Sequence, residues 1–118
     1  MNLKEKIRTI PHFPKQGIMF RDITTLIKDK EGFQHAVNVL AERYKNQPVS
    51  SVAGIESRGF IFGAALAHKL NVGFIPIRKK GKLPAKTEWQ EYDLEYGKDC
   101  VEVHVDAIAP GEIGRAHV

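Results

Sequence analysis

The segment "VSSVAGIESRGFIFGAALAHKLNVGFIPI", residues 49–77, decides the fold. Residues 49–55 are mostly apolar and are predicted to form a buried strand. Residues 59–70 have apolar side chains at helical spacing, and residues 73–77 are predicted to be a second short strand. A strand, a helix and a strand in this order form a β-α-β unit with parallel strands and a right-handed crossover. The predicted fold class is therefore α/β.

Three polar residues, Glu56, Ser57 and Arg58, stand between the first strand and the helix. In an open α/β sheet, ligands bind beyond the carboxyl ends of the strands, where a helix N-terminus offers N–H groups to an anion. A guanidinium and a hydroxyl at that position are groups that hold phosphate. In the alternative interpretation, Ser57 is a plain N-cap and Arg58 a surface residue, and the spacing alone does not decide between the two.

A basic cluster follows the second strand. Its five cations lie within nine residues: Arg78, Lys79, Lys80, Lys82 and Lys86. Most other cations are interspersed with acidic residues, so the net charge of +4 indicates one local anionic partner rather than a nucleic-acid backbone. Because the cluster begins where the second strand ends, Arg78, Lys79 and Lys82 are expected on the same rim as Arg58. A pyrophosphate-sized ligand is predicted there; a solvated basic loop is the alternative.

Length and composition limit the class of protein. The chain has 118 residues, of which 42% are hydrophobic and 27% charged, as expected for one globular domain. No apolar run approaches the roughly 20 residues that span a bilayer, and no apolar signal core follows Met1. Cys100 is the single cysteine, so no internal disulfide can form. A cytoplasmic protein without a membrane partner is expected.

Two helices are expected nearer the amino terminus. The first is a short amphipathic helix over Leu3–Ile10, ended by Pro11. A Pro-Lys-Gln-Gly turn then leads into an extended piece at residues 18–20. Asp29 is the expected N-cap of a longer helix with a core-facing stripe. The residues of that stripe are Phe33, Val37, Leu40, Ala41 and Tyr44.

The polar residues 78–99 carry Gly81 and Pro84 and show no clear period. They are predicted to form a long loop with an edge ribbon near Tyr92–Tyr96, and loops of this length are often functional. Residues 100–105 alternate apolar and polar side chains, which predicts a half-buried strand followed by a Pro-Gly turn.

The aromatic, histidine and cysteine side chains give weaker indications of function. Trp89, Tyr92 and Tyr96 either close over a ligand or cover the edge of the core. The five histidines lack metal-ligand spacing, and Cys100 falls within a predicted strand, where a packing role is expected. Neither a metal site nor a nucleophile is predicted.

Five ordered blocks resemble the adenine phosphoribosyltransferase family of the type I phosphoribosyltransferase fold. The blocks are "FPKQGIMFRDIT" at 13–24, "AGIESRGFIFGAALA" at 53–67, "FIPIRKKGKLP" at 74–84, "YDLEYG" at 92–97 and "VHVDAIAPG" at 103–111. The resemblance implies a parallel sheet flanked by helices, with a long hood loop. It also implies a purine salvage glycosyltransferase that makes AMP and pyrophosphate from adenine and PRPP.

The resemblance implies roles for individual residues. Met19, Phe20 and Arg21 would form the adenine pocket, with Phe20 stacked on the purine ring. The pyrophosphate of PRPP would be bound by Ser57, Arg58, Lys79 and Lys82. Magnesium would enter bound to PRPP, with no metal site on the protein itself.

Further implied roles concern the hood and the dimer. Glu95 is the candidate for proton handling at the purine, and Tyr96 belongs to the same hood. Arg78 would reach the site of the neighbouring subunit in a homodimer. Displacing pyrophosphate passes through an oxocarbenium-like state, so Arg58 is a catalytic candidate because it would stabilise the leaving group.

One family feature is missing from the sequence. An apolar strand with two acidic residues and a Thr-Gly-Gly-Thr-like loop should follow the Pro110-Gly111 turn, but residues 113–118 read "IGRAHV". These six residues can be encoded by a DNA sequence that matches a common sequencing adapter. Residues 1–112 are therefore expected to be a partial phosphoribosyltransferase domain that lacks its carboxyl-terminal strands, and residues 113–118 a non-native tail. We expect the fragment to be inactive.

Two other functions stay open. A PRPP-responsive regulatory protein of phosphoribosyltransferase type would keep the rim at Arg58 and bind DNA through a basic surface. A phosphoribosyltransferase for another base would keep Arg58 but change the pocket near Phe20. Salt-dependent DNA binding and competition between bases would distinguish them.

Overall fold

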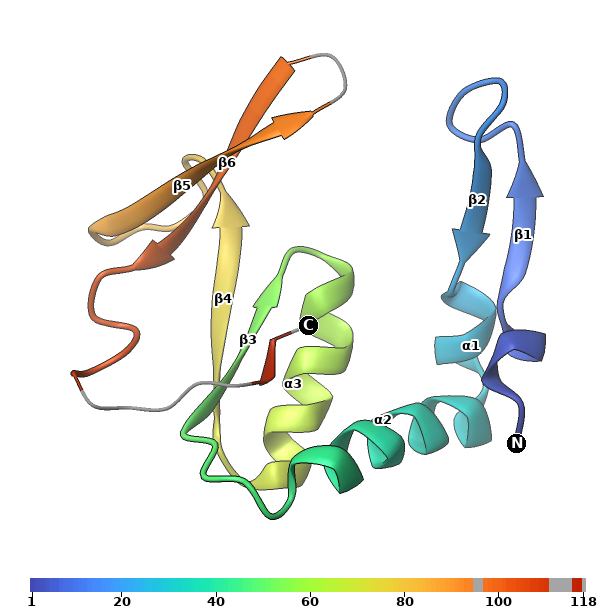
Figure 1. Cartoon of the computed structure of the whole chain (residues 1–118), viewed down its shortest axis with the longest axis horizontal. Coiled ribbons are helices and arrows are strands. Elements are labelled where there is room, and N and C mark those ends of the chain that lie inside the picture. The colour runs from blue at the N-terminus through green and yellow to red at the C-terminus, as the bar shows by residue number, and fades with distance from the viewer. Residues whose placement is uncertain (95–96, 111–115, 118) are drawn as a thin grey trace. The chain divides into compact units, whose positions relative to one another are not determined.

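The computed structural model describes residues 1–94, 97–110 and 116–117. The chain divides into two compact units, Met1–Glu42 and Arg43–Val118. Most helices and strands of both units are labelled in Figure 1.

The first unit is built around an antiparallel pair of strands. β1 (Arg8–Pro11) pairs with β2 (Met19–Asp22), and Ile10 lies opposite Phe20. A 3-10 helix, η1 (Leu3–Lys6), precedes β1, and α1 (Thr24–Lys28) follows β2. The predicted extended piece at residues 18–20 is confirmed.

The helix predicted over Leu3–Ile10 is wrong. Only Leu3–Lys6 is helical, and Arg8–Pro11 is the strand β1. A helix of two turns is marginal on its own, since few of its backbone groups are paired within it. Pairing with β2 satisfies backbone groups of β1 instead, through a contact between segments that local periodicity does not reveal.

The prediction of an N-cap at Asp29 is confirmed. α2 (Lys30–Tyr44) follows it directly, and the Gly32 N–H donates to Asp29 Oδ2 at 2.7 Å. This bond satisfies one of the N–H groups that a helix start leaves unpaired. The buried positions of α2 are Gly32, Ala36 and Ala41. Of the predicted stripe only Ala41 is fully buried; its other members are half-buried.

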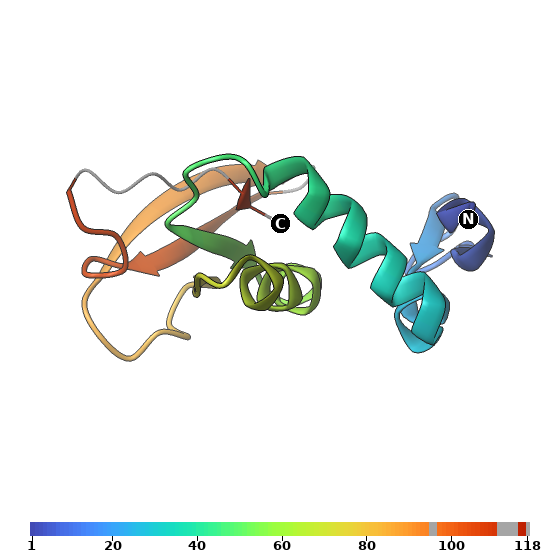
Figure 2. The ribbon, with the colours of Figure 1, turned by 90° about the horizontal axis from the view of Figure 1, so that it is seen from below.

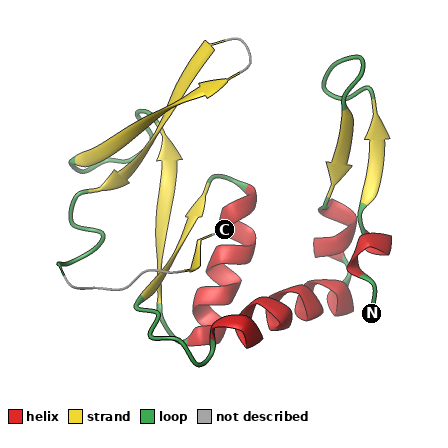
Figure 3. Ribbon diagram, in the orientation of Figure 1, coloured by secondary structure: helices red, strands yellow, loops and turns green. Residues whose placement is uncertain are grey.

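The second unit is a mixed five-stranded sheet with the order β5-β6-β4-β3-β7 (Figure 3). β3 and β4 are parallel and joined by α3, so the predicted β-α-β unit is confirmed. β6 runs antiparallel to both β4 and β5. The elements are β3 (Ser51–Ile55), α3 (Arg58–Leu70), β4 (Gly73–Lys79), β5 (Thr87–Leu94), β6 (Gly97–His104) and β7 (Ala116–His117).

The core of this unit lies where α3 packs on β3 and β4. Val52 and Leu66 are fully buried there. Figure 2 shows α3 against one face of the sheet. The close approach requires glycine at two positions: a Cβ on Gly54 would lie 2.4 Å from the Gly59 carbonyl oxygen, and one on Gly63 would lie 2.6 Å from the Phe74 ring.

The long loop predicted over residues 78–99 is wrong over most of its length, whereas the half-buried strand predicted over residues 100–105 is confirmed by β6, and the edge ribbon predicted near Tyr92–Tyr96 is confirmed as far as Leu94. β4 continues through Lys79, and β5 and β6 form a long hairpin from Thr87 to His104. Most side chains of β5 are exposed on both of its faces, so its sequence lacks the alternation of apolar and polar residues that marks a half-buried strand. The segment between Lys79 and Thr87 remains a loop.

β7 pairs in parallel with β3 through Val52 and Ala53. Its two residues fall within the predicted tail 113–118, whose other positions lie outside the described residues. The foreign origin of that tail stays a prediction. No helix in the described part of the chain is both long and apolar enough to cross a membrane.

Candidate functional site

The entrance of α3 lies at the carboxyl end of β3. Ser57 occupies the N-cap position without a capping hydrogen bond from its side chain, and the helix begins at Arg58. Ser57 and Arg58 are both exposed. The first turn of a helix leaves N–H groups that point outward, and the helix dipole gives that end a partial positive charge. The entrance therefore has the chemistry predicted for binding an anion.

Glu56 connects this entrance to the end of β4. Its Oε1 atom accepts the Lys79 backbone N–H at 2.9 Å and the Arg78 Nε–H at 3.1 Å. Its own backbone N–H donates to the Ile77 carbonyl at 3.0 Å, which continues the ladder of β3 and β4. The Lys79 N–H, then the Arg78 guanidinium and the more distant charge of Lys82, lower the pKa of Glu56 despite opposition from burial. Glu56 is therefore ionised at neutral pH.

Arg78 is held from two sides. Besides the bond to Glu56, its guanidinium lies 5.8 Å from the centre of the Phe60 ring. Phe60 in turn packs edge-to-face on Phe74 of β4. A cation over an aromatic face is attracted by the ring quadrupole. The side chain of Arg78 thus lies against the first turns of α3.

Lys79 and Lys82 belong to a tight turn after β4. The Lys82 N–H donates to the Lys79 carbonyl at 3.2 Å, and Gly81 has a φ of +83°, a conformation that favours glycine. Lys79 Nζ lies 3.6 Å from Asp99 Oδ2 of β6. Arg78, Lys79 and Lys82 thus lie near one another at the end of β4, where Arg78 and the Lys79 N–H bind Glu56, and their role in binding an anion stays a prediction.

Glu102 of β6 fixes the turn from the other side. It accepts the Gly81 N–H at 2.6 Å and the Thr87 hydroxyl at 2.5 Å. The Thr87 hydroxyl, followed by the Gly81 N–H, lowers the pKa of Glu102. The basic turn is therefore held by hydrogen bonds at Gly81 and at Thr87, while its Lys79, Lys80 and Lys82 are exposed.

The predicted adenine residues lie on β2, in the first unit. Met19 is 53% exposed, and the ring of Phe20 meets that of Phe13 edge-to-face at 5.1 Å between centroids. The Arg21 guanidinium donates to the Thr9 hydroxyl across the strand pair. The three residues thus lie side by side on one short strand that is well exposed at Met19.

Asp22 ends β2 and is the buried acid of the first unit. It accepts Arg8 Nε–H at 2.5 Å, and the N–H and hydroxyl of Thr24 at 2.9 and 2.8 Å. The Thr24 N–H, then Arg8, lowers the pKa of Asp22 from 3.8 to about 2. Asp22 thereby joins β1, β2 and the start of α1. Sequence reasoning gave it no role, although an acid two residues before a threonine at a helix start was a usable signal.

The predicted hood residues Glu95 and Tyr96 lie outside the described residues. The hairpin that leads to them ends at the pair Leu94 and Gly97. On the same hairpin, the Tyr92 hydroxyl donates to Asp99 Oδ2 at 3.2 Å, so Tyr92 is bound to its neighbouring strand.

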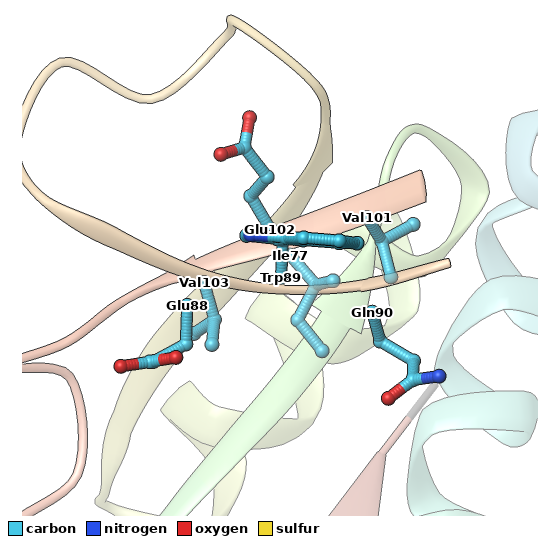
Figure 4. A pocket seen from close by; sticks show the side chains of 7 residues that line it. All are labelled: Ile77, Glu88, Trp89, Gln90, Val101, Glu102 and Val103. Carbon is cyan, nitrogen blue, oxygen red and sulfur yellow. The ribbon is translucent and has the colours of Figure 1, made fainter. Parts of the chain in front are cut away.

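A cavity of about 280 Å³ lies beside the hairpin (Figure 4). The apolar side chains of Ile77, Val101 and Val103 line it, together with Glu88, Trp89, Gln90 and Glu102. Trp89 is 64% exposed, although it also lines this cavity. Among the described residues, no group of three or more His, Cys, Asp or Glu side chains could hold a metal ion.

No family model matches the chain. In sequence and in structure, the chain is similar to adenine phosphoribosyltransferases. The enzyme of that name from Nitrosospira multiformis is 58% identical over 112 residues, which are 95% of this chain and 64% of the relative. The crystal structure of the Thermoanaerobacter pseudethanolicus adenine phosphoribosyltransferase superposes with a TM-score of 0.89 at 49% identity, covering 93% of this chain and 64% of that one.

A third relative carries ligands. The Saccharomyces cerevisiae adenine phosphoribosyltransferase, complexed with an imino-altritol 1,6-bisphosphate and adenine, has a TM-score of 0.86 at 38% identity and covers 93% of this chain and 65% of its own. The chain thus spans a little under two thirds of the length of the relatives that it matches.

Proposed function

Since this chain belongs to the adenine phosphoribosyltransferase family over the 112 residues that match, we propose that it serves the formation of AMP and pyrophosphate from adenine and PRPP, a purine salvage reaction. The observation that carries the proposal is the rim of the second unit. Glu56 ties the basic end of β4 to the entrance of α3, so that Arg78 and Lys79 lie beside Ser57 and Arg58.

This rim suits the leaving group of the reaction. As the bond between C1 of the ribose and pyrophosphate breaks, negative charge grows on the pyrophosphate. Arg58, Lys79 and Lys82 would stabilise that charge, and Ser57 would donate a hydrogen bond to a phosphate oxygen. The helix N-terminus adds N–H donors that need no rearrangement. Magnesium would enter bound to the phosphates of PRPP, as is usual for this ion.

The adenine would bind at β2. Phe20 offers an aromatic face for stacking, and main-chain groups around Met19 and Arg21 offer donors and acceptors for the edge of the purine. The yeast relative, which holds adenine, supports this choice of base. Glu95 in the hood would handle the proton at the purine, and Tyr96 would help to exclude water.

We further propose that the active protein is a homodimer, in which Arg78 reaches the neighbouring site. We also propose that the 118 residues alone give no measurable turnover. They do not contain the acidic pair and Thr-Gly-Gly-Thr-like loop that would hold the ribose and the 5-phosphate.

The test joins residues 1–112 to the remaining carboxyl-terminal third of the Thermoanaerobacter relative. AMP formation from adenine and PRPP is the expected result, with hypoxanthine and uracil failing to compete and Arg58→Ala strongly reducing the rate. Preference for hypoxanthine or uracil would contradict the proposed substrate. A folded chimera that forms no nucleotide, but binds DNA with a steep salt dependence, would favour the regulatory alternative.

A further inference from the structure

Glu56 connects the entrance of α3 to the end of β4, a role that its position in the sequence does not reveal. It is the first of the two residues between β3 and α3, and only 18% of its side chain is exposed. Its Oε1 atom accepts hydrogen bonds from both Arg78 Nε and the Lys79 backbone N–H. A carboxylate therefore lies at the centre of a rim that otherwise gathers cations.

The hydrogen bond to Lys79 completes the end of β4. The last two residues of β4 pair with Glu102 and Val101 of β6 on one side. On the other side β3 has already ended at Ile55. The carboxylate of Glu56 takes the place of a strand neighbour there, and it satisfies the Lys79 N–H that the strand leaves unpaired.

The charge of Glu56 and its hydrogen bonds act in opposite directions on an anion. A carboxylate close to the rim repels pyrophosphate, so its charge alone weakens binding. Its hydrogen bonds fix the end of β4 and the guanidinium of Arg78 before the ligand arrives, and preorganised groups bind more tightly than mobile ones. The sign of the effect of removing Glu56 therefore reveals which contribution dominates.

We propose that Glu56 is a positioning residue of the pyrophosphate site: it holds Arg78 and Lys79 in place, and this outweighs the repulsion that its charge causes. The proposal rests on the proposed function, because it assumes that pyrophosphate binds at this rim. It assigns Glu56 no contact with the substrate.

The test measures the affinity of the 118-residue chain for magnesium pyrophosphate by calorimetry. Glu56→Ala removes both hydrogen bonds and should raise the dissociation constant about tenfold. Glu56→Gln keeps a carbonyl oxygen of the same reach without the charge, and its dissociation constant should stay within about threefold of the wild type. Glu56→Asp keeps the charge but is shorter, so it should resemble the alanine variant.

A matched control removes a carboxylate elsewhere. Glu91 is exposed on β5 and lies 3.4 Å from Lys98, away from the contacts of Glu56. Glu91→Ala should leave the affinity unchanged. Hydrogen exchange of the Lys79 amide gives a readout independent of binding: its protection should fall in the alanine and aspartate variants and persist in the glutamine variant.

The outcomes distinguish failure of the positioning role of Glu56 from failure of the proposed pyrophosphate site. If the wild type binds pyrophosphate and Glu56→Ala binds it as tightly or more tightly, the positioning role is overturned. If the glutamine and aspartate variants reverse their expected order, charge governs the site and the role is equally overturned. If the folded wild type binds no pyrophosphate, the proposed pyrophosphate site is overturned, and the positioning role that assumes it is overturned as well. Melting curves identify any variant that does not fold. If Glu56→Ala does not fold, the affinities of Glu56→Gln and Glu56→Asp decide whether Glu56 has the positioning role.

Discussion

Glu56 and Lys79, 23 positions apart in the sequence, are joined across the ends of two parallel strands by a hydrogen bond of 2.9 Å from the Lys79 N–H to Glu56 Oε1. Parallel strands bring their carboxyl ends to the same edge of a sheet. The bond therefore links the entrance of α3 to the basic turn, and this link supports the proposal that a pyrophosphate-sized anion binds at this edge.

The tight packing of α3 on β3 predicts a large cost for a single methyl group. A Cβ on Gly54 would approach the Gly59 carbonyl oxygen to 2.4 Å, so Gly54→Ala should destabilise the chain by about 1–3 kcal/mol. Gly73→Ala is the control, because nothing lies within 4 Å of its Cβ position. Urea denaturation followed by circular dichroism measures both. Equal stability of the two variants would contradict the described packing.

The hydrogen bonds of Asp22 predict that the stability of the folded chain depends on pH. Because folding lowers its pKa from 3.8 to about 2, the folded state favours the ionised carboxylate. The resulting stabilisation is complete above pH 4 or so and is lost as the pH falls towards 2. Asp22→Asn should therefore be less stable than the wild type at neutral pH, and the difference should shrink on acidification. A difference that is the same at pH 7 and pH 2 would contradict this, with Asp93→Asn on exposed β5 as the control.

The proposed stacking of adenine on Phe20 predicts that loss of this ring weakens the binding of adenine. Stacking of a base on an aromatic ring contributes about 1–3 kcal/mol, so Phe20→Ala in the chimera should raise the KM for adenine about tenfold or more. Phe20→Tyr keeps the ring and should restore adenine binding. The affinity for pyrophosphate is the internal control and should not change. Equal adenine KM values for the alanine and tyrosine variants would exclude stacking.

The β-α-β unit could be predicted because its signals are local. Apolar residues at strand and helix periods mark β3, α3 and β4, and their order fixes the parallel pairing. The short helix predicted over Leu3–Ile10 failed, since the strand β1 depends on its pairing with β2. The hairpin of β5 and β6 was predicted only in part, as a half-buried strand over residues 100–105 and an edge ribbon near Tyr92–Tyr96. The first residues of β5 were missed because their side chains are mostly exposed and the strand depends on its pairing with β6.

In the candidate site, too, the features with local sequence signals could be predicted and those that depend on distant residues could not. The grouping of Arg78, Lys79 and Lys82 followed from the rule that ligands bind at the carboxyl ends of parallel strands. The acids Glu56 and Glu102, which hold these cations and their turn in place, could not be found by spacing because each acts on residues at least 15 positions away. Asp22 also binds Arg8 across a strand pair, 14 positions away.

The most direct measurement is a calorimetric titration of the 118-residue chain with magnesium pyrophosphate, made in parallel on Arg58→Ala and Lys69→Ala. Both variants remove one cation from α3, at opposite ends of the helix. We predict one saturable site in the wild type and in Lys69→Ala, and a dissociation constant raised about tenfold or more in Arg58→Ala, as expected for loss of a charge-assisted bond. Binding that is absent from the folded wild type, or equal in the two variants, would contradict a pyrophosphate site at the entrance of α3.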